Sequence, residues 1–211
     1  MPYSLRTSFL ATAYYSWLER RILPRFPEWG MSPNRLTCIG MLFSLAVPLG
    51  FWIHPVWGFF LIMLSGAADS MDGLMARHQN RTSRWGAFLD SSLDRISDFF
   101  YLVGFWVVFW RHAAPAPATL AIFFVALMTT LISYTKARAE ALGVPCPVGL
   151  MERGVRVAFL MMWALLLALV PDGRNIVLWL GLTIYGILAL FTVLQRGFYI
   201  MHHMADRKSM T

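Results

Sequence analysis

The sequence predicts an all-α integral membrane protein with six transmembrane helices, preceded by an N-terminal amphipathic helix in the membrane interface. Of its 211 residues 58% are hydrophobic and only 14% are charged, and the mean hydropathy is +0.57. A soluble domain carries about 25% charged residues, so a chain of this size must expose much of its apolar area to lipid. These values exclude a cytosolic enzyme and a disordered chain. The two cysteines, Cys38 and Cys146, are too few for a secreted disulfide scaffold.

Residues 1–30 are predicted to form the interfacial amphipathic helix and a linker. Apolar side chains recur there at helical spacing, with charges gathered at one end: Leu10, Tyr14, Trp17, Leu18 and Ile22. The stretch lacks a clean apolar core before a small-residue cleavage site, so it does not resemble a signal peptide. A disordered leader is the alternative.

Six apolar segments follow, and prolines mark most of their boundaries. They cover about 34–53, 56–76, 86–110, 117–136, 154–170 and 176–200. A helix needs ~20 apolar residues to cross a bilayer, and only Pro48 interrupts one of these runs. We therefore expect one six-helix transmembrane domain over residues 31–203, followed by a cytoplasmic tail over 204–211.

Basic residues orient this arrangement. All Lys and Arg except Arg111 and Arg174 fall on the side that holds both termini and the loops 77–85 and 136–153. Because positive charge stays in the cytosol, both termini should be cytoplasmic, in the inner or plasma membrane of the cell. The same bias accounts for much of the net charge of +7, so the basic excess does not indicate a nucleic-acid partner.

Five of the eleven carboxylates flank one short loop between two hydrophobic spans: Asp69, Asp72, Asp90, Asp94 and Asp98. An uncompensated Asp near the bilayer centre costs roughly 2.5–3.5 kcal/mol, so this group needs cations or water. The first two lie three residues apart and the next two four apart, so each pair shares one helix face. A short loop makes the two helices neighbours, and the pairs can then face each other.

Four carboxylates without His or Cys predict a hard oxygen site for Mg²⁺ or Mn²⁺, with room for two ions. The alternative is a set of helix-end acids paired with nearby arginines, which explains one or two carboxylates but not two facing pairs: Arg77, Arg81, Arg84 and Arg95. Gly73 and Gly86 lie beside the acids, where glycine lets a ligand approach closely. Taken alone, these glycines are more often helix-packing residues.

The residues form the pattern Asp69-x2-Asp72-Gly73-x2-Ala76-Arg77-x8-Gly86-x3-Asp90-x3-Asp94. At all eight fixed positions this pattern resembles the signature of the CDP-alcohol phosphotransferases, which are six-helix membrane enzymes of phospholipid synthesis and commonly homodimers. The resemblance implies a cytoplasmic active site. There, an acceptor hydroxyl attacks the β-phosphorus of a CDP-linked lipid such as CDP-diacylglycerol, and CMP leaves.

The same resemblance implies roles for individual residues. It makes four residues the metal ligands: Asp69, Asp72, Asp90 and Asp94. Asp94 would also be the catalytic base for the acceptor hydroxyl. The CDP-lipid is expected at two places, of which the second, at the start of the first span, is a shorter match: Gly73, Arg77, Ser83 and Gly86, and then Asn34 and Thr37.

A basic cluster concerns the acceptor. Lys136 ends the fourth span, Arg153 precedes the fifth, and Arg196 lies deep in the sixth. Basic groups that converge near the metals would suit a phosphate on the acceptor. The positive-inside bias is the alternative, and it readily explains Lys136 and Arg153 but explains Arg196 less well. We therefore favour the phosphate site.

The stretch 136–153 also resembles the inositol-phosphate branch of the family, whose members make phosphatidylinositol phosphate or its archaeal ether-lipid counterpart. This implies inositol 1-phosphate as acceptor, with its phosphate held by five residues: Ser133, Lys136, Arg138, Arg153 and Arg196. Glycerol 3-phosphate is the alternative acceptor. A Mg²⁺-dependent membrane prenyltransferase and an ion transporter are more distant alternatives, and Asp98 receives no role.

Overall fold

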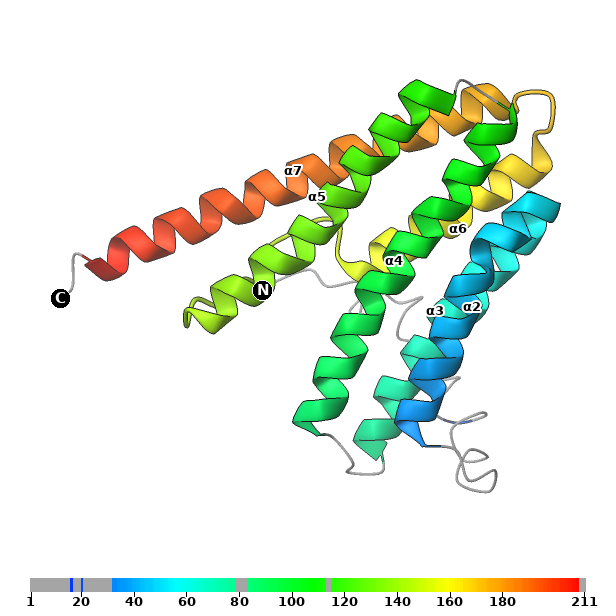
Figure 1. The fold of residues 1–211 in the computed structure, drawn as a ribbon. Helices are drawn as coiled ribbons and strands as arrows, with labels where there is room; N and C mark the ends of the chain where they lie inside the picture. Colours follow the sequence, from blue (N-terminus) through cyan, green and yellow to red (C-terminus); the bar gives the residue numbers. More distant parts are fainter. Residues whose placement is uncertain (1–15, 17–19, 21–31, 79–82, 113–114, 209–211) are drawn as a thin grey trace.

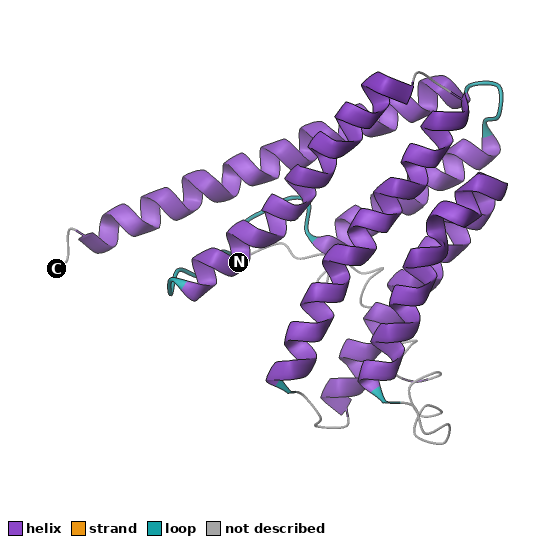
Figure 2. Cartoon of the chain, viewed as in Figure 1, coloured by secondary structure: helices purple, strands orange, loops and turns teal. Residues whose placement is uncertain are grey.

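The computed structural model describes residues 16, 20, 32–78, 83–112 and 115–208, where helices are joined by short loops and no strand occurs (Figure 2). Its long helices are α2 (Pro33–Ile53), α3 (Pro55–His78), α4 (Arg84–His112), α5 (Pro115–Ala141), α6 (Arg153–Leu169) and α7 (Arg174–Lys208). They correspond in order to the six predicted segments. Apart from Ser16 and Arg20, the predicted interfacial helix falls outside the described residues.

Three of these helices are long and apolar enough to cross a membrane by length and composition: Pro33–Ile53, Pro115–Ala141 and Arg174–Met204. The first continues through Pro48, as transmembrane helices often do. Of the others, α3 and α4 carry the aspartates, and α6 has only 17 residues.

The helices form two groups. In one, α2 packs against α3 and α4, and in the other α5 packs against α7, while α6 packs against α3 and α4 against α5. Figure 1 shows that α5 and α7 diverge from the first group toward the ends at which α3 finishes and α4 begins. The site described below lies between the diverging groups.

Close packing in the first group depends on glycine. Phe51 of α2 lies over Gly58 of α3 and Gly104 of α4, where an added Cβ would come within 2.6 and 2.5 Å of the Phe51 ring. Without side chains at these two positions the three helices can approach one another closely. This packing holds together the two helices that carry the aspartates.

Candidate active site

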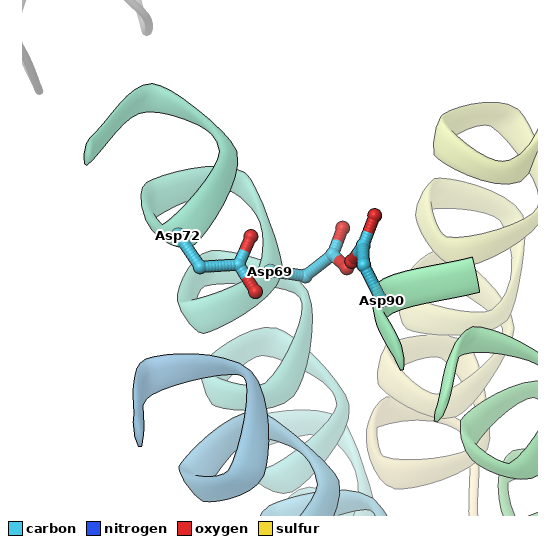
Figure 3. A group of neighbouring side chains, drawn as sticks. All are labelled: Asp69, Asp72 and Asp90. Atoms are coloured by element: carbon cyan, nitrogen blue, oxygen red, sulfur yellow. The ribbon is translucent and has the colours of Figure 1, made fainter. Parts of the chain in front are cut away.

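Carboxylates from α3 and α4 meet where these two helices are joined. One oxygen of each of Asp69, Asp72 and Asp90 lies within 4.8 Å of the others, and Figure 3 shows the carboxylates of Asp69 and Asp90 next to each other. Asp72 is the most buried, with 4% of its surface exposed. Three acids from two helices thus form one oxygen cluster, which is a donor set suited to a hard divalent cation.

Asp94 lies one turn further along α4, and an arginine joins it to this cluster. Nη2 of Arg153, the first residue of α6, lies 3.0 Å from Asp94 Oδ1, and its Nη1 forms an ion pair with Asp69. Arg95 of α4 donates instead to the carbonyl of Ser91. Among the described residues, the cation that pairs with these acids therefore comes from α6.

Thr37 of α2 contacts the acidic cluster. Its hydroxyl donates to Asp72 Oδ2 over 2.5 Å, and the bond is buried. A hydrogen bond from a neighbouring helix fixes the orientation of a carboxylate that would bind a metal. The structure therefore brings Thr37, predicted to contact the CDP-lipid, directly onto one of the acids.

Three more residues of the predicted CDP-lipid site gather where α2 and α4 begin. Ser83 caps α4, with its hydroxyl accepting from the backbone N–H of Gly86 over 2.9 Å. A Cβ on Gly86 would lie 3.1 Å from Ser83 Oγ and 3.6 Å from Asn34 Oδ1. Arg77 belongs to the last turn of α3, and its side chain lies outside the described residues.

The aspartates line an open cavity of ≈ 850 Å³, to which all helices from α3 to α7 contribute. Ser133 and Lys136 of α5, Arg153 of α6 and Arg196 of α7 line it as well. Four of the five predicted acceptor residues therefore share a cavity with the acids. The fifth, Arg138, is exposed and does not line it.

Arg196 is held by backbone carbonyls, which explains its depth in an apolar helix. Its Nε donates to the carbonyl of Val148 over 2.9 Å and its Nη1 to that of Ile132, and the residue is 3% exposed. Gly149 makes room for it, because a Cβ there would lie 2.7 Å from Nε, and its φ of +134° disfavours other residues. Arg196 therefore also ties α7 to α5 and to the loop before α6.

Sequence reasoning missed one buried ion pair next to the cavity. Arg156 of α6 donates to Asp98 of α4 over 2.6 Å. A signal was present, since Asp98 follows Asp94 by one helical turn and Arg156 follows Arg153 by three residues. The two pairs therefore lie on the same faces of their helices.

Comparison with known proteins gives a consistent result. The sequence profile of the CDP-alcohol phosphatidyltransferase family matches residues 30–190. The phosphatidylinositol phosphate synthase of Streptomyces avermitilis is 35% identical over 190 residues, which cover 86% of this chain and 77% of that protein. The archaetidylinositol phosphate synthase of Methanothermobacter thermautotrophicus is 30% identical over 192 residues, which cover 89% of this chain and 92% of that protein.

Solved structures of the phosphatidylinositol phosphate synthase of Mycobacterium tuberculosis share the fold at 27% identity. The structure in complex with manganese and citrate has a TM-score of 0.72 and covers 85% of this chain and 87% of its own. The structure with CDP-DAG bound has a TM-score of 0.71 and covers 85% and 91%. The apolar helices of this chain and its likeness to lipid-synthesis enzymes make it a membrane protein.

Proposed function

Because the chain belongs to the CDP-alcohol phosphatidyltransferase family, we propose that it transfers the phosphatidyl group of CDP-diacylglycerol to a hydroxyl of inositol 1-phosphate and releases CMP. It is a transferase of phospholipid synthesis. One observation carries the assignment of the acceptor: the acidic cluster and four residues of the predicted phosphate site line the same cavity. Such a cavity can hold the nucleoside diphosphate group of a CDP-linked lipid together with a second anionic substrate.

The acidic cluster fits Mg²⁺ or Mn²⁺. Opposite ligands of Mg²⁺ at 2.0–2.1 Å lie about 4.2 Å apart, and the three carboxylate oxygens already lie within 4.8 Å of one another. Asp69, Asp72 and Asp90 would hold one ion, and Asp94 would join them for a second. Bound metal neutralises the diphosphate and stabilises the leaving CMP. The Mycobacterium tuberculosis enzyme solved with manganese supports this proposal.

Asp94 is the proposed base. The acceptor oxygen forms a bond to the phosphorus that carries the lipid, the bond from that phosphorus to the oxygen of CMP breaks, and CMP leaves with the electron pair. The hydroxyl proton passes to Asp94. An ordinary Asp is a weak base near neutral pH, so its position within hydrogen-bond reach of the hydroxyl matters more than its basicity.

The CDP-lipid is placed at the junction of α2, α3 and α4. Gly73 lines the cavity beside Asp72, and Gly86 lies next to Ser83 and Asn34. Arg77, one turn after Gly73, supplies a guanidinium for a phosphate oxygen. The neighbouring structure with CDP-DAG bound supports this placement.

We place the acceptor phosphate at the basic part of the cavity lining, formed by Ser133, Lys136, Arg153 and Arg196. Arg138, which does not line the cavity, is the fifth residue of the proposed site. Two or more basic groups suit a doubly charged phosphate, and guanidinium groups bind it through paired hydrogen bonds. Relatives named for inositol phosphate lipids support inositol 1-phosphate over glycerol 3-phosphate.

In this proposal all six helices cross the membrane, and residues 31–203 form the catalytic domain. Both termini and the cavity face the cytosol, because nearly all basic residues lie on that side. The acyl chains of the CDP-lipid then stay in the bilayer while its head group reaches the cytosolic edge. A homodimer remains a prediction from the family resemblance.

An acceptor panel tests the proposal. Purified enzyme with CDP-diacylglycerol and Mg²⁺ is offered inositol 1-phosphate, glycerol 3-phosphate, inositol or serine, and CMP is measured. We expect CMP with inositol 1-phosphate, together with a lipid that carries inositol phosphate. CMP with glycerol 3-phosphate alone would reassign the acceptor. Pyrophosphate released from an added polyprenyl diphosphate, with no CMP from CDP-diacylglycerol, would favour prenyl transfer. Cation flux in liposomes without a CDP-lipid would favour a transporter.

A further inference from the structure

Two arginines of α6 face two aspartates of α4. Arg153 contacts Asp94 at the cavity, and one turn deeper Arg156 donates to Asp98 over 2.6 Å. The aspartates lie four residues apart on their helix and the arginines three apart on theirs, so each helix presents its pair along one face. The result is an outer ion pair, Asp94 with Arg153, and an inner ion pair, Asp98 with Arg156, one turn further along both helices.

A third contact continues in the same direction. The ring of Phe105 of α4 stacks on Trp163 of α6, with centroids 3.9 Å apart and planes 13° apart. The three contacts follow one another in the same order along both helices, which therefore run parallel here. In all three contacts a long side chain of α6 (Arg153, Arg156 or Trp163) reaches α4, while the backbone of α6 packs on α3. These side chains therefore align α6 with α4.

The inner pair is a poor source of stability. Asp98 and Arg156 are 4% and 2% exposed, yet Asp98 Oδ1 and Arg156 Nε have no hydrogen-bond partner within the described part of the chain. Buried ion pairs with unsatisfied atoms are costly, and replacing both partners by apolar residues is often neutral or stabilising. A role in positioning explains this pair better than a role in stability.

Arg156 also holds the backbone from which α6 starts. Its Nη1 donates to the carbonyl of Met151 over 3.0 Å, two residues before Arg153. Although Arg156 reaches the wall of the cavity, its guanidinium is engaged by Asp98 and by this carbonyl. Its contacts therefore fix the start of α6 on both sides of Arg153.

We propose that Asp98 and Arg156 are a positioning pair, which sets α6 against α4 so that Arg153 stands in the cavity beside Asp69 and Asp94. The proposal rests on the proposed function, in which Arg153 binds the phosphate of the acceptor. In this proposal neither residue of the pair contacts a substrate, because both terminal nitrogens of Arg156 are engaged by Met151 and Asp98. Their loss acts on acceptor binding through Arg153, and it leaves the CDP-lipid side of the cavity unchanged.

The double variant Asp98→Leu/Arg156→Met tests this, because it removes both charges together at similar volume. We expect an unfolding temperature in detergent near that of the parent enzyme, an unchanged KM for the CDP-lipid, and a KM for inositol 1-phosphate raised about tenfold. The polar variant Asp98→Asn/Arg156→Gln makes the same test if the apolar one does not fold. Asp172→Asn, an exposed change in the turn between α6 and α7, should alter neither KM.

Arg153→Gln separates this proposal from the proposed function. If Arg153→Gln leaves the KM for inositol 1-phosphate unchanged, the acceptor assignment fails. If it raises that KM while the double variant does not, only the positioning role is overturned. Combined with Arg153→Gln, the double variant should add little further effect, since coupled residues are not additive. A fully additive rise, or an equal rise in KM for the CDP-lipid, would contradict action through Arg153.

Discussion

The two walls of the cavity are built in different ways. The acidic wall comes from two consecutive helices and one short loop, and its aspartates lie within 26 residues of sequence. The basic wall is assembled from α5, α6 and α7, and its arginines are held by carboxylates or by backbone carbonyls of other elements. Local spacing therefore determines the first wall, whereas tertiary packing determines the second.

This difference bears on function. A divalent cation needs oxygens at closely fixed distances, which adjacent turns of two packed helices supply. An acceptor must be told apart from other alcohols, and Ser133, Lys136 and Arg196 lie on helices that carry none of the proposed metal ligands. We therefore expect changes to the acidic wall to abolish the reaction and changes to the basic wall to alter which acceptor is used.

Metal removal should have the largest effect, because it disables the acidic wall completely. Chelation with EDTA is expected to stop CMP release from CDP-diacylglycerol, and Mg²⁺ or Mn²⁺ should restore it. The measurement is CMP formation before and after metal is added back. Undiminished activity in EDTA after dialysis would show that the carboxylates do not act through a metal.

Asp94→Asn should lower kcat by about 10²–10⁴-fold, the range typical of a lost general base. Binding of CDP-diacylglycerol should be largely preserved, since the other three acids remain. Turnover and equilibrium binding of the CDP-lipid are measured side by side, with Asp172→Asn as the matched control. Near-normal turnover would refute the proposed role of Asp94.

Lys136→Ala tests the basic wall. Loss of one charged hydrogen-bond donor to a phosphate should raise the KM for inositol 1-phosphate about tenfold, while the KM for the CDP-lipid stays constant. Arg174→Gln is the matched control. Arg174 begins α7, lies beside His112 and does not line the cavity. A rise of both KM values together would show that Lys136 does not recognise the acceptor specifically.

Gly149→Ala should have a smaller effect on the reaction than Lys136→Ala, and it should also lower the stability of the protein. A side chain at φ +134° collides with Arg196, and backbone strain of this kind costs about 1–3 kcal/mol. We expect a lower unfolding temperature together with a raised KM for inositol 1-phosphate. Gly197→Ala is the matched control, because a Cβ there meets nothing within 4 Å. Equal unfolding temperatures of the two variants would argue against the close contact between Gly149 and the Arg196 side chain.

The sequence predicted the helices and the acidic wall better than it predicted the contacts of the basic wall. Apolar runs and prolines located all six long helices within a few residues, apart from the extended ends of α5 and α7, since these signals are local. Helical spacing likewise brought Asp69, Asp72 and Asp90 to one cluster. Both results depend on the periodicity of a helix and on a short loop.

Pairings between distant helices were beyond this reasoning. Spacing alone could not show that Arg153 would join Asp69 to Asp94 or that Thr37 would donate to Asp72, because each contact links residues far apart in sequence. Arg196 was recognised as unusual, but its carbonyl partners were not foreseen. Asp98 was noticed without a partner, because the matching spacing of Arg153 and Arg156 becomes informative only once Arg153 is known to meet Asp94.

The most direct test asks whether the two walls bind two different substrates. Equilibrium binding of CDP-diacylglycerol and of inositol 1-phosphate is measured for Asp72→Asn and for Lys136→Ala, with Mn²⁺ present throughout. The account predicts that Asp72→Asn weakens binding of the CDP-lipid alone and that Lys136→Ala weakens binding of inositol 1-phosphate alone. If both variants weaken the same ligand, or neither ligand, the division of the cavity into two walls is contradicted.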